Sequence, residues 1–312
     1  MNHMGPTDAP TLARLLTPYA DWLTLLGCLA LAALYLYGVV TLARRGDRWP
    51  VSRTVAWLLG LFTVLLVTCT GIGSYGMALF SVHMIQHMVL SMVSPILLLL
   101  GAPITLALRV LRPAPRGRRG PREILVAVLR SRAARVLTSP LITLPLFIAS
   151  LYGLYFTSLF DTLMSTWWGH HAMLVHFVLV GFVFFWPIMG TDPAPHRPPH
   201  VFRMLELFIA MPFHAFFGVA VMQSSTLMTT TFAHPPLFWN IKPLADQHVA
   251  GGIAWAFSEA PTLLVLGALL YQWIRDEERK ARRADRAADR DGDAELEAYN
   301  AYLARINQQA GG

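Results

Sequence analysis

Residues 81–92 read SVHMIQHMVLSM, and this stretch is unusually polar for the apolar segment that contains it. At about 100° per helical residue, His83 and His87 share one face of the predicted helix. A ridge of methionines lies beside that face, formed by Met84, Met88 and Met92. Imidazole and thioether groups are borderline and soft ligands, which copper accepts more readily than magnesium or calcium does. An ordinary explanation stands beside this one, because a histidine in a membrane helix often only packs and methionines at helical spacing often only fill a core.

The composition of the whole chain indicates that its solvent is lipid. The chain has 312 residues, of which 55% are hydrophobic and only 14% are charged. Apolar runs of about 20 residues, enough to cross about 30 Å of hydrocarbon, recur along most of the sequence. Backbone groups in lipid must satisfy their own hydrogen bonds, so each run is interpreted as a helix. We therefore expect an all-α, multi-pass protein of the bacterial plasma membrane.

Seven apolar runs are long enough to be spans. They cover approximately residues 21–43, 55–72, 77–101, 138–160, 170–189, 201–224 and 248–274. Arginine-rich linkers follow the first, third, fifth and seventh of them. Because cytoplasmic loops carry an excess of Lys and Arg, this alternation predicts a seven-helix bundle with its N-terminus outside and its C-terminus in the cytoplasm.

Charge and cysteine usage add to this topology. No cleavable signal peptide is apparent, so the first run is expected to be retained as a span. We expect a transmembrane domain over residues 1–274 and a charged cytoplasmic tail over residues 275–312. The formal charge of +7 follows the arginine-rich linkers, so nucleic acid is not expected as a partner. Cys28 and Cys69 lie on different spans and form neither a disulfide framework nor a CxxC metal motif.

With this orientation, the histidines inside the spans gather in the outer half of the membrane. Ionisable residues at such depths usually face the interior of a bundle and indicate function. The candidate metal ligands are His83, His87, His171, His176, His214, Met84, Met88 and Met222. The candidate supporting residues, for charge balance or proton uptake, are Asp246, His248, Glu259 and His170.

The last apolar run contributes the acidic member of this set. His248, Gly252, Trp255 and Glu259 share one helical face by their spacing. A carboxylate buried in a membrane needs a cation or a hydrogen-bond donor. We therefore expect Glu259 to face the interior at the depth of the imidazoles on other helices, with His87 or His214 as its partner.

The donor types favour copper, and other functions remain open. Mixed His and Met ligands without a Cys pair suit copper better than structural zinc, and the outer-facing Met77, Met164 and Met228 offer further thioethers as transient ligands. Bis-histidine haem is the main rival cofactor, which would make the chain an electron-transfer subunit. A transporter of copper or protons is another alternative, although the cytoplasmic half shows only Glu206 beside Arg203. A retinal protein is not expected, because the last apolar run has no lysine.

Several short motifs together resemble the polytopic CtaG family of cytochrome c oxidase assembly proteins, from the second to the seventh apolar run. The motifs are His83–Met88 with Pro95 and Gly101–Pro103, His171–His176, Gly181–Pro187, Asp192–Pro193, Phe213–His214 with Gly218, Asp246–Gln247 with Ala250–Gly251, and Trp255 with Glu259–Pro261. The resemblance implies an integral membrane factor that is needed to make an active haem-copper oxidase. It implies copper handling on the outer face and oxidase subunits as partners. No turnover chemistry is expected, because transfer between sites needs only ligand exchange. An extracytoplasmic copper chaperone is a further expected partner.

Overall fold

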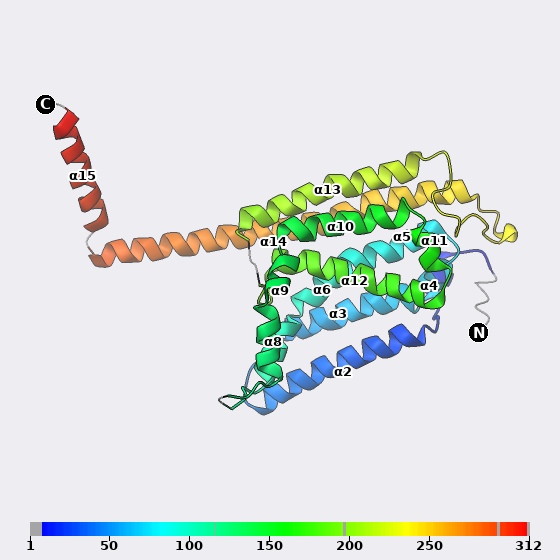
Figure 1. The fold of residues 1–312 in the computed structure, drawn as a ribbon, viewed down its shortest axis with the longest axis horizontal. Coiled ribbons are helices and arrows are strands. Elements are labelled where there is room, and N and C mark those ends of the chain that lie inside the picture. Colours follow the sequence, from blue (N-terminus) through cyan, green and yellow to red (C-terminus); the bar gives the residue numbers. More distant parts are fainter. Residues whose placement is uncertain (1–7, 116, 196–197, 292–293, 311–312) are drawn as a thin grey trace. The chain divides into compact units, whose positions relative to one another are not determined.

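The computed structural model describes residues 8–115, 117–195, 198–291 and 294–310, and these residues are all-helical, without a β-strand (Figure 1). The prediction of an all-α protein is therefore confirmed. Among these residues, six helical segments are long and apolar enough to cross a membrane. They are Trp22–Arg44, Val51–Thr68, Phe80–Val110, Trp167–Met189, His200–Gln223 and Pro243–Arg286. The chain is thus a multi-pass membrane protein.

The chain divides into two compact units, Met1–Val265 and Leu266–Gly312. The elements that begin in the first unit are α1 (Leu12–Leu15), α2 (Trp22–Arg44), α3 (Val51–Thr68), α4 (Gly71–Tyr75), α5 (Phe80–Met88), η1 (Val89–Val93), α6 (Ser94–Leu100), α7 (Pro103–Val110), α8 (Pro121–Leu129), α9 (Arg132–Leu137), α10 (Pro140–Tyr155), α11 (Leu159–Met164), α12 (Trp167–Met189), α13 (His200–Gln223), η2 (Leu237–Trp239) and α14 (Pro243–Asp291). The second unit holds the rest of α14 and α15 (Ala294–Ala310).

The stretch that opens the sequence analysis lies in a helix that changes its winding. α5, the π-helical η1 and α6 follow one another without a break from Phe80 to Leu100. The rod ends where Ala102 adopts a left-handed conformation with φ of 49°, and Pro103 then starts α7. A single π-helical turn within an α-helix re-aims the side chains on either side of it and is frequent at functional sites.

The fourth apolar run forms a shorter helix than predicted. α10 has 16 residues, or about 24 Å of rise. It ends at Tyr155 because Thr157 turns back to the carbonyl of Gly153 (2.6 Å) and its hydroxyl also accepts from the amide of Leu159 (3.2 Å), just before α11. The predicted span 138–160 therefore covers α10 and the start of α11. Six helices among the described residues reach the length of a full span, so the predicted count of seven spans is not confirmed.

α12 and the rod from α5 to α6 form the centre of the first unit. In each of these two spans 56% of the residues in the apolar window are buried, against 17% in α2. α12 packs against η1 and α6, and a side chain at Gly181 would overlap the carbonyl oxygen of Ser91 and the ring of Pro95. Small residues at such contacts let two backbones approach closely. In lipid, where no hydrophobic effect drives helices together, this close van der Waals packing stabilises their association.

Three aspartates hold distant segments together by accepting hydrogen bonds from backbone amides. Asp246 accepts from the first two amides of α5 (2.6 and 3.2 Å) and from the hydroxyl of Ser81. Asp192 accepts from the amides of the second and third residues of α7 (3.0 and 2.7 Å). Asp161 accepts from the amides of residues 230–231 (2.9 and 3.0 Å). The first two carboxylates satisfy amides that the start of a helix leaves unpaired.

We predict that Gly181→Ala destabilises the bundle by about 1–3 kcal/mol, because its methyl group forces α12 away from Ser91. The measurement is reversible unfolding in detergent micelles. Gly153→Ala is the matched control, since a side chain there meets nothing within 4 Å and alanine favours a helix. Equal stability of the two variants would contradict the backbone contact.

Candidate functional site

His83 and His87, one turn apart on α5, are both buried, with exposed fractions of 0% and 3%. Nε2 of His83 lies 2.8 Å from the hydroxyl of Tyr155, and Nδ1 of His87 lies 3.2 Å from the same oxygen. Rings of Phe160 and Phe177 pack edge-on against these imidazoles. The helical spacing therefore aims the two histidines at one point, as predicted, and a phenol from α10 occupies that point.

This arrangement satisfies neutral groups in a site that water does not reach. The hydroxyl has one proton to donate and lone pairs to accept with, so it bonds to one imidazole as donor and to the other as acceptor. Nδ1 of His83 is buried and has no hydrogen-bond partner among the described residues. A metal that used both facing nitrogens would first have to displace the hydroxyl of Tyr155.

His214, on α13, is buried and lies across a small cavity from His87. The cavity has a volume of about 10 Å³ and is also lined by Ser91 and Ser150. The Ser91 hydroxyl is buried without a hydrogen-bond partner among the described residues. A space of this size holds about one water molecule. His176 lies on the exposed side of α12 and contacts the hydroxyl of Ser150 at 2.6 Å, so Ser150 stands between it and the cavity.

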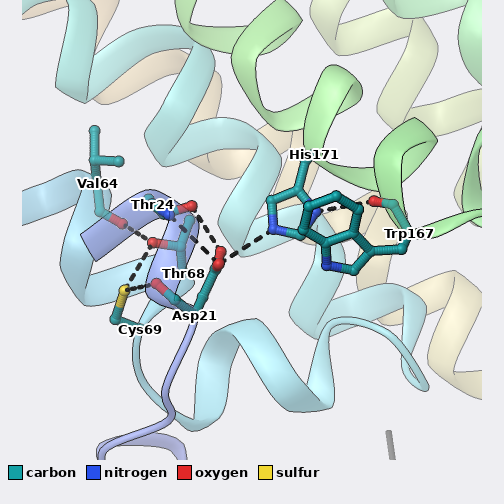
Figure 2. A network of polar contacts seen from close by, with 7 residues as sticks. All are labelled: Asp21, Thr24, Val64, Thr68, Cys69, Trp167 and His171. Atoms are coloured by element: carbon teal, nitrogen blue, oxygen red, sulfur yellow. Dashed lines mark hydrogen bonds and ion pairs between the residues drawn. The ribbon is translucent and has the colours of Figure 1, made fainter. Parts of the chain in front are cut away.

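His171 is held at the start of α12 by an ion pair with Asp21, which caps α2 (Figure 2). Its Nε2 lies 3.1 Å from Asp21 Oδ1 and its Nδ1 lies 2.9 Å from the carbonyl oxygen of Trp167. Both partners are hydrogen-bond acceptors, so His171 makes both contacts as hydrogen bonds only in its protonated form. Burial alone raises the pKa of the Asp21 carboxyl, but hydrogen bonds from Thr24 and His171 outweigh it and lower the pKa below its usual value.

A pocket of about 560 Å³ opens beside this ion pair, and we call it the mouth pocket. It is lined by residues at the starts of α2 and α12, and the start of α2 lies at the opposite end of that helix from the linker to α3 (Figure 1). Its potential metal donors are His170, His171, Asp21, Met77 and Met164. The carboxamide of Gln86, which also lines the pocket, donates to the carbonyl of Val67 at 2.9 Å. The pocket is partly open to its surroundings, and two imidazoles, two thioethers and one carboxylate line it.

The five predicted imidazole ligands do not form one coordination sphere. Across the described residues, no three His, Cys, Asp or Glu side chains lie close enough to hold a metal ion together. Met84 and Met88 are fully buried, and Met222 is partly buried where α13 meets Gly251 of α14. The structure brings His83 to His87 and His87 to His214, and it separately brings His170 to His171 at the mouth pocket.

Two supporting residues have structural partners. The carboxylate of Asp246 caps α5, with its oxygens occupied by the two amides and the Ser81 hydroxyl. Nε2 of His248 lies 3.1 Å from the carbonyl oxygen of Ser224, at the end of α13. Both residues therefore hold α14 to its neighbours.

The prediction that Glu259 faces the interior of the bundle is wrong. Its side chain is exposed on the outside of the first unit, and neither His87 nor His214 contacts it. The buried side of α14 is instead formed by small residues four apart, Ala250, Ala254 and Ser258. Close packing of small residues, rather than the position of the polar ones, decided which face of α14 turns inward.

Sequence reasoning missed the two residues that organise these sites. Tyr155 is one aromatic among many in an apolar run, and no periodicity indicates that it meets α5. Asp21 did carry a signal, because an Asp directly before an apolar helix is a preferred N-cap. That signal gives its place on α2 but not its ion pair with α12.

The helices and the half-open pocket define a multi-pass helical membrane protein with a His-, Met- and Asp-lined pocket at one end. Residues 33–276 match the family described as cytochrome c oxidase caa3 assembly factor (Caa3_CtaG). The chain belongs to this family, and the resemblance inferred from its motifs is confirmed.

Similar proteins occur in mycobacteria. The chain is 47% identical over 303 residues to the uncharacterized proteins Mb0105 of Mycobacterium bovis and MT0111 of Mycobacterium tuberculosis, covering 96% of this chain and 46% of each relative. It is 45% identical over 277 residues to the uncharacterized protein ML1998 of Mycobacterium leprae, covering 88% of this chain and 42% of that relative. The chain therefore spans less than half the length of these relatives. No solved structure matches it.

We predict that Tyr155→Phe destabilises the protein by about 1–3 kcal/mol, because it leaves the facing nitrogens of His83 and His87 buried without a partner. Thermal unfolding in detergent measures the loss. Tyr152→Phe is the control, since that hydroxyl donates to a backbone carbonyl in an exposed position. If both variants unfold alike, the phenol does not bridge the two imidazoles.

A second prediction concerns acid. Because the pKa of Asp21 is lowered in the folded protein, its ionised form stabilises the fold above the usual carboxyl pKa of 3.8, and this contribution disappears as the pH falls through the lowered value. Asp21→Asn keeps a good N-cap but removes the charge. We expect it to lower the unfolding midpoint at pH 7, and we expect the difference from the wild type to be smaller at pH 2. A difference that is the same at both pH values would contradict the ion pair.

Proposed function

We propose that this chain assists cytochrome c oxidase assembly by taking up copper as cargo at the mouth pocket and passing it to an oxidase subunit. The observation that carries the proposal is the lining of this pocket, where His170, His171, Met77, Met164 and Asp21 come together. Imidazole and thioether donors suit copper. The pocket does not surround the ion with a complete set of ligands. An open site of this kind suits an ion that must leave again, because each ligand can be exchanged in turn.

The ion pair of His171 gives copper uptake a defined first step. Copper binds a deprotonated imidazole nitrogen, so His171 must release the proton that faces Asp21. Asp21 then supplies a negative charge next to the bound cation. No turnover chemistry is required, and transfer needs only ligand exchange between this pocket and the recipient site. An extracytoplasmic copper chaperone is the donor that this scheme needs.

The topology supports this role when the spans are counted as seven. α10 packs against α12 and α13 within the bundle although it is short. The arginine-rich linkers before α3 and after α7 lie together, since Arg109 pairs with Asp47 (3.5 Å). With these linkers in the cytoplasm, the mouth pocket faces the outside and the tail of residues 275–312 lies inside, after a transmembrane domain of residues 1–274.

The buried histidines of the predicted ligand set are less accessible to a metal ion than the mouth pocket. His83, His87 and His214 face one another with Tyr155 and a one-water cavity between them. Copper reaches them only if the phenol moves aside. We therefore assign first contact with the metal to the mouth pocket and treat the deeper imidazoles, with Met84 and Met88 on α5, as the second candidate binding site; His176 and Met222 lie apart from it.

A transporter is the second candidate function, and one observation favours it. Buried polar groups continue below the cavity. Arg203 and Glu206 on α13 have exposed fractions of 1% and 3%, and Thr143 donates to Glu206 at 2.5 Å. Together with the imidazoles they form a discontinuous series of polar groups through the bundle, of the kind that proton pathways use.

We expect the purified chain to bind Cu(I), and the double variant Met77→Leu and Met164→Leu to bind it at least about tenfold more weakly, a change of about 1.4 kcal/mol. Competition with a chromophoric Cu(I) chelator measures this affinity. The matched control is Met189→Leu with Met204→Leu, which removes two thioethers outside the mouth pocket.

Two outcomes would count against the proposal. Equal affinities for the two double variants would move the metal away from the mouth pocket. Copper that appears inside sealed vesicles reconstituted with the wild-type chain would favour the transporter instead.

A further inference from the structure

α14 exposes a carboxylate in the middle of its apolar run. Glu259 is the only charged residue between Val249 and Ile274. Its side chain points out of the first unit, and among the described residues no hydrogen bond or ion pair reaches it. Ionisable residues at this depth usually turn inward or pair with another group, because hydrocarbon does not solvate them. Within this chain the carboxylate does neither.

The helix cannot rotate to bury this carboxylate. Gly251 and Gly218 bring α14 and α13 so close that a side chain at either glycine would meet the other's carbonyl oxygen, at 2.6 and 2.7 Å. Ala254 and Ser258 extend the same buried side. Trp255 already borders this contact, because its Cβ and amide nitrogen would lie 2.8 Å from a side chain at Gly218. A turn large enough to bring Glu259 inside would therefore drive the Trp255 ring into α13. The outward direction of Glu259 is therefore fixed by the packing.

A second acceptor lies next to Glu259. Pro261 is inside the helix and has no amide proton, so it cannot donate to the carbonyl of Phe257. The same side of α14 carries exposed Ala256 and Ala260, one turn apart. Small residues at this spacing let a second helix approach the backbone. This side of α14 thus offers hydrogen-bond acceptors, and at the same depth its small side chains let the backbone of a second helix come close.

We propose that the surface formed by Trp255, Ala256, Glu259, Ala260 and Leu263 docks a transmembrane helix of the oxidase that carries an Arg, Lys or protonated His. We call this surface the Glu259 face. A cationic donor satisfies the carboxylate, and the alanines let the partner backbone come close. The proposal rests on the proposed function only for the identity of the partner, because an assembly factor must contact its oxidase within the membrane.

A second copy of this chain fits the Glu259 face less well. A symmetric dimer presents the same surface from both sides, so two Glu259 carboxylates would meet. Like charges in a medium of low dielectric repel each other strongly. The charge on the face therefore selects a basic partner over a copy of itself.

The test reconstitutes the full-length chain with a purified caa3-type cytochrome c oxidase in phosphatidylethanolamine and phosphatidylglycerol nanodiscs, and measures association by energy transfer between labels outside the membrane. We expect Glu259→Leu to weaken association at least tenfold while the isolated variant unfolds no earlier than the wild type. Glu259→Gln keeps the size of the side chain and is expected to lose most of the association as well. Glu278→Gln, which removes an exposed carboxylate from the tail, is the control and is expected to bind unchanged.

Three outcomes would overturn the proposal. Association of Glu259→Leu equal to that of the wild type removes the Glu259 face as an interface. Full association of Glu259→Gln excludes a cationic partner. Loss of a wild-type homodimer in Glu259→Leu, seen by mass measurement without oxidase, assigns the face to self-association.

The same variants separate this proposal from the copper proposal. Cu(I) affinity at the mouth pocket is expected to be unchanged in Glu259→Leu. A chain that binds no copper but still docks through Glu259 would contradict only the proposed function. A chain that binds copper and docks independently of Glu259 would contradict only this inference.

Discussion

The contact between Gly181 of α12 and the backbone of Ser91 governs the arrangement of the polar groups. Because no side chain separates the two backbones, the helix that carries His170, His171 and His176 is fixed against the rod that carries His83 and His87. The π-helical turn at this contact changes the register between the two ends of the rod. The mouth pocket and the deeper imidazoles are thus two sites on one rigid pair of helices, and neither can move without the other.

The histidines of α5 and the histidine at the start of α12 are paired with groups of different charge. The imidazoles of α5 share the hydroxyl of Tyr155, whereas His171 pairs with the carboxylate of Asp21 at the start of α2. A charge is less costly near the surface than in the hydrocarbon. This division supports the proposed uptake of metal at the mouth pocket rather than at the deeper imidazoles of α5, which are buried.

Sequence reasoning predicted the class of fold and that the two histidines of α5 share one helix face, because both follow from short-range features of the sequence. Apolar length predicts spans, and a 3.6-residue period puts His83 and His87 on one face. It did not predict Tyr155 as their partner, because the pairing of α10 with α5 is a property of the whole bundle. It predicted that Glu259 faces inward because it took the face of α14 with polar residues to be the buried one. The buried face is instead the one with small residues, such as Gly251 and Ala254. The predicted fourth span was too long because Thr157 ends the helix by bonding back to its own turn.

The cap that Asp246 places on α5 has a consequence for biosynthesis. The two partners lie 166 residues apart, so α5 enters the bilayer long before the ribosome has made the residue that completes its N-terminus. Until then its first amides depend on water or on lipid headgroups. The entrance beside α5 therefore acquires its final form only when α14 has been inserted.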